Sequence, residues 1–169
     1  MPATTKEPIQ AGRKAPAFKL QDQEGTTHAL ADYAGAPVVL FFYPKDSTSG
    51  CTQEACDFRD QRAALKKLGA RVLGISILDT KSKAKFAIKN DLNFPLLADD
   101  RVDGDGKPDP VVAQKYGVWV EKSMYGRTYM GIERTTFLID AQGKIARVWS
   151  KVKVPGHVDE VVAALKALD

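Results

Sequence analysis

Short apolar runs alternate with segments of helical periodicity through the middle of the chain. Residues 36–43 form a continuous run rich in Val and Phe, which predicts a strand buried on both faces. Residues 71–78 and 94–98 predict two further buried strands. Between these runs, residues 51–68 and 81–92 carry apolar side chains at helical spacing. The order of strand, helix, strand, helix, strand is typical of an α/β fold with parallel strands.

The two ends of the chain add elements to this α/β pattern. Residues 17–20 and 26–30 flank the turn-forming sequence Asp-Gln-Glu-Gly, which predicts an N-terminal β-hairpin. Further elements are predicted toward the C-terminus: a short helix at 111–116, strands at 132–140 and 144–149, and a helix at 157–168. The two strands in that set are separated by Ala-Gln-Gly, a hairpin turn. Together these elements predict a central mixed β-sheet flanked by helices.

The chain has the size and composition of a single soluble domain. Its 169 residues weigh 18.5 kDa and include 44% hydrophobic and 27% charged residues. Residues 1–12 are polar and contain proline, so we expect a flexible N-terminal arm there. Residues 13–169 contain no internal repeat and no long linker, and we expect one domain over that range.

Charge and hydropathy narrow the classes of partner. The net charge of +4 comes from 25 basic and 21 acidic residues that are well mixed, so nucleic-acid binding is not indicated. The longest strongly apolar run, residues 38–43, is far shorter than the roughly 20 residues of a membrane helix. The first residues also lack the apolar core of a signal peptide. We therefore expect a cytoplasmic protein without a membrane partner. A monomer is expected because no additional exposed apolar helix or long edge strand is evident.

Cys51 and Cys56 are the only cysteines, which are too few for a disulfide scaffold. Cys51 follows Gly50 where the strand signal gives way to the helix signal, with Thr48 and Ser49 as candidate helix caps. Unpaired N–H groups and a partial positive charge at a helix start favour thiolate over thiol. A lone cysteine is more often a small buried hydrophobic residue, but this position favours a reactive one.

The spacing of the two cysteines predicts a reduced folded state. On one helix, five residues advance the chain about 7.5 Å, which separates the Cα atoms of Cys51 and Cys56 by about 8 to 9 Å. Cα atoms joined by a disulfide normally lie within about 6.8 Å of each other. A bridge therefore requires the first turn or two of the helix to unwind. This geometry suits a redox cycle, in which Cys51 becomes a sulfenic acid and then condenses with Cys56.

Cys51 would become a sulfenic acid by attacking one oxygen of a peroxide. This reaction needs hydrogen-bond donors and a cation around the two peroxide oxygens. The hydroxyl of Thr48 and the N–H groups of Gly50 and Cys51 are candidates. Pro44 ends the apolar strand and is expected to shape the loop and shield the thiolate. Arg134, at the start of a predicted strand, could supply a permanent charge. From spacing alone, a solvated arginine at the strand end is an equal alternative.

These residues resemble a known family. Residues 44–51 match the Pro-x-x-x-Thr/Ser-x-x-Cys signature of peroxiredoxins, and Cys51-x-x-x-x-Cys56 is similar to the bacterioferritin comigratory protein or peroxiredoxin Q subgroup. Familial stretches also include 94–99, 116–118, 129–140 and 149–157. The resemblance implies a thioredoxin-like fold and an atypical 2-Cys thiol peroxidase. Its expected substrates are hydrogen peroxide and organic hydroperoxides, and thioredoxin or a glutaredoxin-like dithiol protein would recycle it.

The resemblance also implies roles for the site residues. Cys51 would be the peroxidatic cysteine and Cys56 the resolving one. Pro44, Thr48 and Arg134 would form the peroxide pocket, to which the helix start adds Gly50 as a substrate-binding residue through its N–H group. No metal, haem or flavin is implied. Ser49 stands where many relatives have proline, and the acidic loop at 103–109 is longer than usual. A calcium-loop alignment of that stretch puts wrong residues at two ligand positions, so an ordinary turn is favoured.

Three other functions are compatible with two thiols. A thiol-disulfide oxidoreductase would normally use Cys-x-x-Cys, so four intervening residues argue against it. A zinc module of Cys51, Cys56, His28 and His157 lacks paired ligand spacings, and both histidines are more simply surface residues. A redox sensor or holdase that uses the same disulfide switch stays open as a secondary activity.

Overall fold

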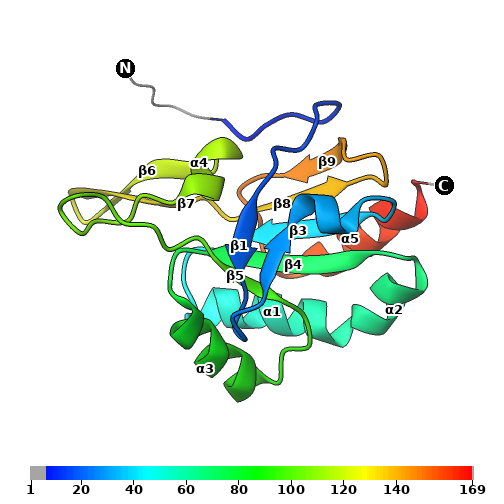
Figure 1. Cartoon of the computed structure of the whole chain (residues 1–169), viewed down its shortest axis with the longest axis horizontal. Coiled ribbons are helices and arrows are strands. Elements are labelled where there is room, and N and C mark those ends of the chain that lie inside the picture. The colour runs from blue at the N-terminus through cyan, green and yellow to red at the C-terminus, as the bar shows by residue number, and fades with distance from the viewer. Residues whose placement is uncertain (1–6, 169) are drawn as a thin grey trace.

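A seven-stranded mixed sheet forms the centre of the computed structural model, which describes residues 7–168 (Figure 1). The strand order is β2-β1-β5-β4-β3-β8-β9. The strands are β1 (Lys19–Gln21), β2 (Thr27–Ala29), β3 (Val38–Phe42), β4 (Arg71–Ser76), β5 (Leu96–Ala98), β8 (Thr135–Ile139) and β9 (Ile145–Trp149). β3, β4 and β5 are parallel, whereas β1 and β8 join them in antiparallel register. The predicted mixed sheet and its N-terminal hairpin are confirmed.

Helices cover both faces of this sheet. They are η1 (Leu30–Tyr33), α1 (Ser49–Asp60), α2 (Arg62–Lys67), α3 (Thr80–Asn90), α4 (Val111–Lys115) and α5 (His157–Lys166). In Figure 1, α1, α2 and α3 lie below the sheet and α4 lies above it. The α3 boundaries follow from local chemistry. Asp79 accepts a hydrogen bond from the Ser82 N–H at the start, and Asp91 adopts a left-handed conformation at the end.

Alternate residues of the buried strands build two separate cores. Val39 and Phe41 of β3 face α1, α2, α3 and α5, with Phe58 of α1 stacked on Phe41 at a centroid distance of 4.6 Å. Leu40 and Phe42 face the opposite side, toward α4 and the chain around Tyr116. All five residues of β3 are buried, as its uninterrupted apolar sequence predicts.

One predicted helix is divided in two. The periodicity predicted a single helix over 51–68, but α1 ends at Asp60 and α2 begins at Arg62. Gln61 between them has φ −98° and ψ 8°, outside helical values. Its N–H still donates to Asp57, and its carbonyl accepts from Leu65. Because hydrogen bonding continues and Leu65 still reaches the core, the apolar pattern carried no sign of the break.

A second hairpin was absent from the sequence prediction. β6 (Trp119–Met124) and β7 (Arg127–Ile132) pair with each other and project from the body of the molecule (Figure 1). Most residues of β7 are exposed, so neither strand shows a clear alternation of apolar and polar positions. The turn is Tyr125-Gly126, with positive φ values of 52° and 79°, rather than the more recognisable Asn-Gly.

The predicted arm over residues 1–12 lies partly outside the described residues, which begin at residue 7. Within the described part, the Ile9 N–H donates to the Tyr116 carbonyl at 3.2 Å and the Gly12 N–H to the Ile145 carbonyl at 2.7 Å. A Cβ on Gly117 would lie 2.2 Å from the Glu7 carbonyl oxygen, so this close contact needs glycine. Over residues 7–168, no helix combines the length and the apolar character needed to cross a membrane.

Candidate active site

The junction of β3 and α1 places Cys51 inside the protein. After Tyr43 the chain leaves the sheet, forms a loop over residues 44–48, and enters α1, where Cys51 lies in the first turn. Its side chain is 1% exposed and belongs to the same core as Ala55 and Phe58. Cys56 lies on the same helix, is half-buried, and has a free thiol, as does Cys51. Helical geometry therefore keeps the two Cα atoms about 8 to 9 Å apart.

Arg134 reaches Cys51 from 83 residues away in sequence. It lies between β7 and β8, and its Nη2 donates to the Cys51 Sγ at 3.4 Å. Nη1 donates to Glu54 Oε1 at 2.7 Å. Burial by itself lowers the pKa of Arg134, but the neighbouring charges of Glu54 and Cys51 raise it above its ordinary value. Arg134 is therefore a permanent cation beside the sulfur, not a solvated residue at a strand end.

Glu54 is a site residue that the sequence reading missed. It follows Cys51 by three residues on α1, so both side chains lie on the same helix face. The Glu54 side chain is fully buried, and its Oε2 has no hydrogen-bond partner in the described structure. Burial raises the pKa of Glu54 from 4.5 to about 7, although the Arg134 charge acts in the opposite direction. Glu54 accepts a hydrogen bond from Nη1 of Arg134, while Nη2 of the same guanidinium group donates to the Cys51 sulfur.

The other predicted site residues lie in the loop before α1 and in its first turn. A Cβ on Gly50 would lie 3.2 Å from Arg134 Nη2, so glycine lets the guanidinium approach the helix start. Thr48 is the N-cap residue, but its side chain makes no capping hydrogen bond, contrary to expectation. Its hydroxyl instead donates to the Lys45 carbonyl at 3.2 Å. Pro44 is half-buried and directly follows the end of β3.

Comparison with known proteins identifies the family. Residues 11–148 match the AhpC/TSA family. The chain belongs to that family. The chain is 50% identical to "Putative peroxiredoxin bcp" of Coxiella burnetii over 157 residues, which cover 93% of this chain and 99% of the relative. Peroxiredoxin Bcp of Escherichia coli strain K12 is 46% identical over 159 residues, covering 94% and 97% of the two chains.

Solved structures agree with this assignment. Xanthomonas campestris peroxiredoxin Q is 41% identical and superposes with a TM-score of 0.82, covering 94% of this chain and 98% of that chain. A structure of Xanthomonas campestris bacterioferritin comigratory protein, determined to study its alkyl peroxide reduction activity, is also 41% identical with a TM-score of 0.82. It covers 93% of this chain and 98% of that chain. The family resemblance and the thioredoxin-like fold inferred from the sequence are confirmed.

In this peroxiredoxin, a buried polar network anchors the loop that precedes Cys51. Asp46 is its centre: one carboxylate oxygen accepts from the Tyr43 hydroxyl at 2.5 Å and the other from the Ser82 hydroxyl at 2.6 Å. The Lys83 ammonium lies 3.4 Å from Asp46 and donates to the Ser76 hydroxyl at 2.7 Å. Burial lowers the pKa of Lys83, and Asp46 partly offsets that effect. The network ties the loop to β4 and α3.

The two histidines are not simple surface residues, which corrects the sequence reading. His157 is 3% exposed, and its Nε2 lies 2.8 Å from the Thr136 hydroxyl. Burial lowers the pKa of His157 to about 4, so its ring is neutral near pH 7. His28 is half-buried and lies 2.7 Å from the Asp22 carboxylate. Across residues 7–168, no group of three or more His, Cys, Asp or Glu side chains is arranged to hold a metal ion.

The raised pKa of Glu54 predicts a pH dependence of stability. Between pH 4.5 and about pH 7 the unfolded chain loses the Glu54 proton while the folded protein keeps it. The unfolded state then binds fewer protons, so the free energy of unfolding falls as the pH rises through this window. The full fall due to Glu54 is about 3 kcal/mol. Glu54→Gln should remove that fall, which urea unfolding at about pH 5 and about pH 8 measures.

Exposed Glu24 offers the matched control, because Glu24→Gln removes the same kind of charge at the surface. Its free energy of unfolding should keep the pH dependence of the unsubstituted protein. Identical pH profiles for Glu54→Gln and the unsubstituted protein would contradict the raised pKa of Glu54.

Proposed function

We propose that this protein is a thiol peroxidase in which Cys51 reduces hydrogen peroxide and organic hydroperoxides. The observation that carries the proposal is the 3.4 Å contact between Arg134 Nη2 and the Cys51 Sγ, in the first turn of α1. A permanent cation and unpaired N–H groups at a helix start both stabilise negative charge that develops on the reacting atoms. The similarity to peroxiredoxins, including one studied for alkyl peroxide reduction, supports the same substrate class.

The first step oxidises Cys51 and reduces the peroxide. The thiolate attacks one peroxide oxygen, the O–O bond breaks, and Cys51 becomes a sulfenic acid. The departing oxygen takes a proton and leaves as water or an alcohol. Arg134 and the N–H groups of Gly50 and Cys51 are the proposed donors for the two oxygens, where charge develops as the bond breaks. The Thr48 hydroxyl would join them after releasing the Lys45 carbonyl, to which it donates in this structure. Pro44 would limit access of water. No metal, haem or flavin takes part.

The second step uses Cys56. Its thiol condenses with the Cys51 sulfenic acid, which forms an S–S bond and releases water. Because α1 separates the two Cα atoms by about 8 to 9 Å, the first turn or two must unwind before the bond can form. A dithiol protein such as thioredoxin or a glutaredoxin-like protein would then reduce the disulfide by thiol exchange. We place this cycle in the cytoplasm, where such reductants maintain free thiols.

Cys56→Ser tests this division of roles. The variant should still consume one equivalent of hydrogen peroxide, because Cys51 and Arg134 are unchanged. It should then stop turning over with thioredoxin and its reductase, and Cys51 should accumulate as sulfenic acid and its overoxidised forms. Stopped-flow peroxide consumption and mass spectrometry of the Cys51 peptide measure both outcomes. Full thioredoxin-dependent turnover by Cys56→Ser would remove Cys56 from the cycle.

A further inference from the structure

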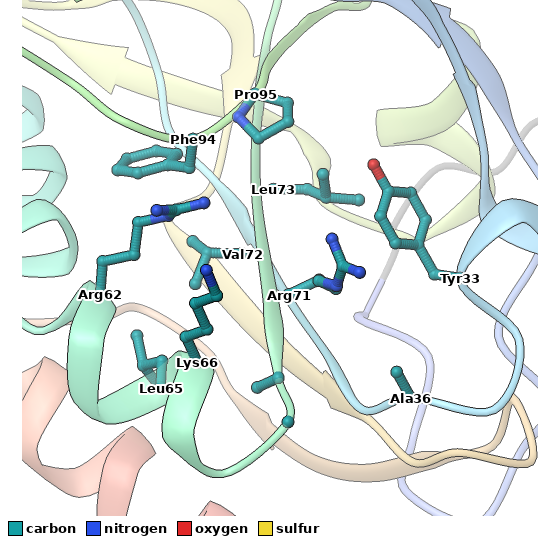
Figure 2. A pocket seen from close by; sticks show the side chains of 12 residues that line it. Tyr33, Ala36, Arg62, Leu65, Lys66, Arg71, Val72, Leu73, Phe94 and Pro95 are labelled. Atoms are coloured by element: carbon teal, nitrogen blue, oxygen red, sulfur yellow. The ribbon is translucent and has the colours of Figure 1, made fainter.

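A cavity of about 450 Å³ lies beside the first residues of β4. β5 begins at Leu96, which pairs with Gly74, so the segment 71–73 extends beyond the start of its neighbour. The cavity occupies this space, between α2 on one side and Tyr33 on the other, with Pro95 at its rim (Figure 2). The sheet therefore has a gap at this corner that other side chains do not fill.

A main-chain donor faces this gap. The Arg71 N–H donates to the Pro37 carbonyl, toward β3, and the Gly74 N–H donates to the Pro95 carbonyl, toward β5. Successive residues of a parallel strand alternate between the two neighbours. Val72 therefore presents its N–H on the β5 side, before β5 has begun, and it lines the cavity. A ligand with an oxygen acceptor could complete the hydrogen bonding there.

Three basic side chains surround the same gap. Arg62 and Lys66 lie one turn apart on α2, and Arg71 begins β4. Figure 2 shows all three side chains at the cavity, with Arg62 beside the ring of Phe94. None of the three makes an ion pair or a side-chain hydrogen bond within residues 7–168, and no Asp or Glu lines the cavity. Positive charge without an ion-pair partner and a main-chain N–H on the β5 side of β4 both favour an anion.

We propose that this cavity binds the phosphate group of a small phosphomonoester. Two guanidinium groups can each offer a fork of parallel donors to phosphate oxygens, and an ammonium group adds a point charge. The combined charge matches a dianion. Phe94 and Pro95 form an apolar rim suited to the organic part of the ligand. Tyr33 lines the cavity but is not proposed as a ligand-binding group, because its hydroxyl is already hydrogen-bonded to His28 at 2.5 Å.

The cavity is separate from the proposed peroxide site. β3 and β4 run parallel, with Val38 paired to Arg71 at their first residues. Cys51 follows the other end of β3, so the two sites lie at opposite ends of these strands. Within residues 7–168, neither Arg62 nor Arg71 forms a hydrogen bond or ion pair with Cys51, Glu54 or Arg134. Substitutions in the cavity should therefore leave peroxide consumption unchanged.

Calorimetric titration of the full-length reduced protein with phenyl phosphate and with inorganic phosphate tests the proposal. We expect saturable binding at one site and at least a ~10-fold loss of affinity in the double variant Arg62→Gln/Arg71→Gln. Lys67→Gln is the matched control, because Lys67 belongs to α2 but does not line the cavity. It should change the affinity less than about 2-fold. Urea unfolding confirms that the variants remain folded.

The two probes distinguish the source of the phosphate. Tighter binding of phenyl phosphate supports a phosphomonoester, whereas equal binding of the two probes supports recognition of the free anion by the same site. Absence of saturation up to about 10 mM of either probe overturns the proposal. An equal loss of affinity in Lys67→Gln and the double variant also overturns it, because the attraction would then come from the general charge of the surface.

Discussion

Replacing Cys51 with serine should reduce peroxide turnover by at least about 1,000-fold, to the background rate. Serine has nearly the same shape, but its hydroxyl is not ionised near neutral pH and cannot attack a peroxide oxygen as a thiolate does. The fold should survive, because within residues 7–168 the one polar contact of the Cys51 Sγ is the 3.4 Å contact with Arg134. Peroxide consumption measured with thioredoxin and its reductase gives the rate, and circular dichroism checks the fold.

Arg134→Lys keeps the Cys51 sulfur and changes only the cation beside it, so its turnover can be compared with that of Cys51→Ser. Lysine keeps the charge but lacks the planar fork whose Nη2 and Nη1 donate to Cys51 and Glu54 in fixed directions. We expect turnover in this variant to fall by about 100-fold, less than in Cys51→Ser.

Peroxide consumption by Cys51→Ser at the unsubstituted rate would show that another group reacts with the peroxide.

Lys83→Met should lower the free energy of unfolding by about 3 kcal/mol. The Lys83 side chain is fully buried, and so is the Asp46 carboxylate beside it, with exposures of 0% and 1%. Methionine fills the same volume but leaves Asp46 as a buried charge. Hydrogen bonds from Tyr43 and Ser82 still reach Asp46, which keeps the loss at the lower end of the range for a broken buried pair. Urea unfolding measures the change.

Two further variants make the Lys83→Met result specific. Lys85→Met lies two residues along α3 and is exposed, so its free energy of unfolding should change by less than about 0.5 kcal/mol. Lys83→Met combined with Asp46→Asn removes both charges, and its loss should be smaller than the sum of the two single losses. Equal small effects for Lys83→Met and Lys85→Met would show that the buried pair does not hold the loop.

The part of the site that local sequence determines was predictable. The apolar run at 36–43 and the change of period at Cys51 predicted the strand and the helix start, and α1 begins only two residues before Cys51. These elements depend on short-range chemistry: burial of a continuous apolar strand and helix formation after a loop. Cys51 and Cys56 could therefore be placed on one helix without knowledge of the rest of the fold.

Long-range pairing of charged groups was not predictable in this way. Glu54 and Lys83 are charged residues in amphipathic helices, where polar positions normally face solvent. Each lies beside a distant partner of opposite charge, Arg134 for Glu54 and Asp46 for Lys83, which offsets part of the cost of burial. Only the family resemblance predicted that Arg134 lies next to Cys51. The order of the strands in the sheet decides which loops lie side by side, and local sequence does not specify that order.

Hydrogen exchange of α1, followed by mass spectrometry before and after one equivalent of hydrogen peroxide, tests the proposed cycle most directly. Formation of the Cys51–Cys56 disulfide should remove protection from the amides of the first two turns of α1, while the amides of β3 stay protected. Cys56→Ser, oxidised in the same way, should keep those turns protected. A Cys51–Cys56 disulfide that forms with α1 fully protected would contradict the requirement for local unwinding.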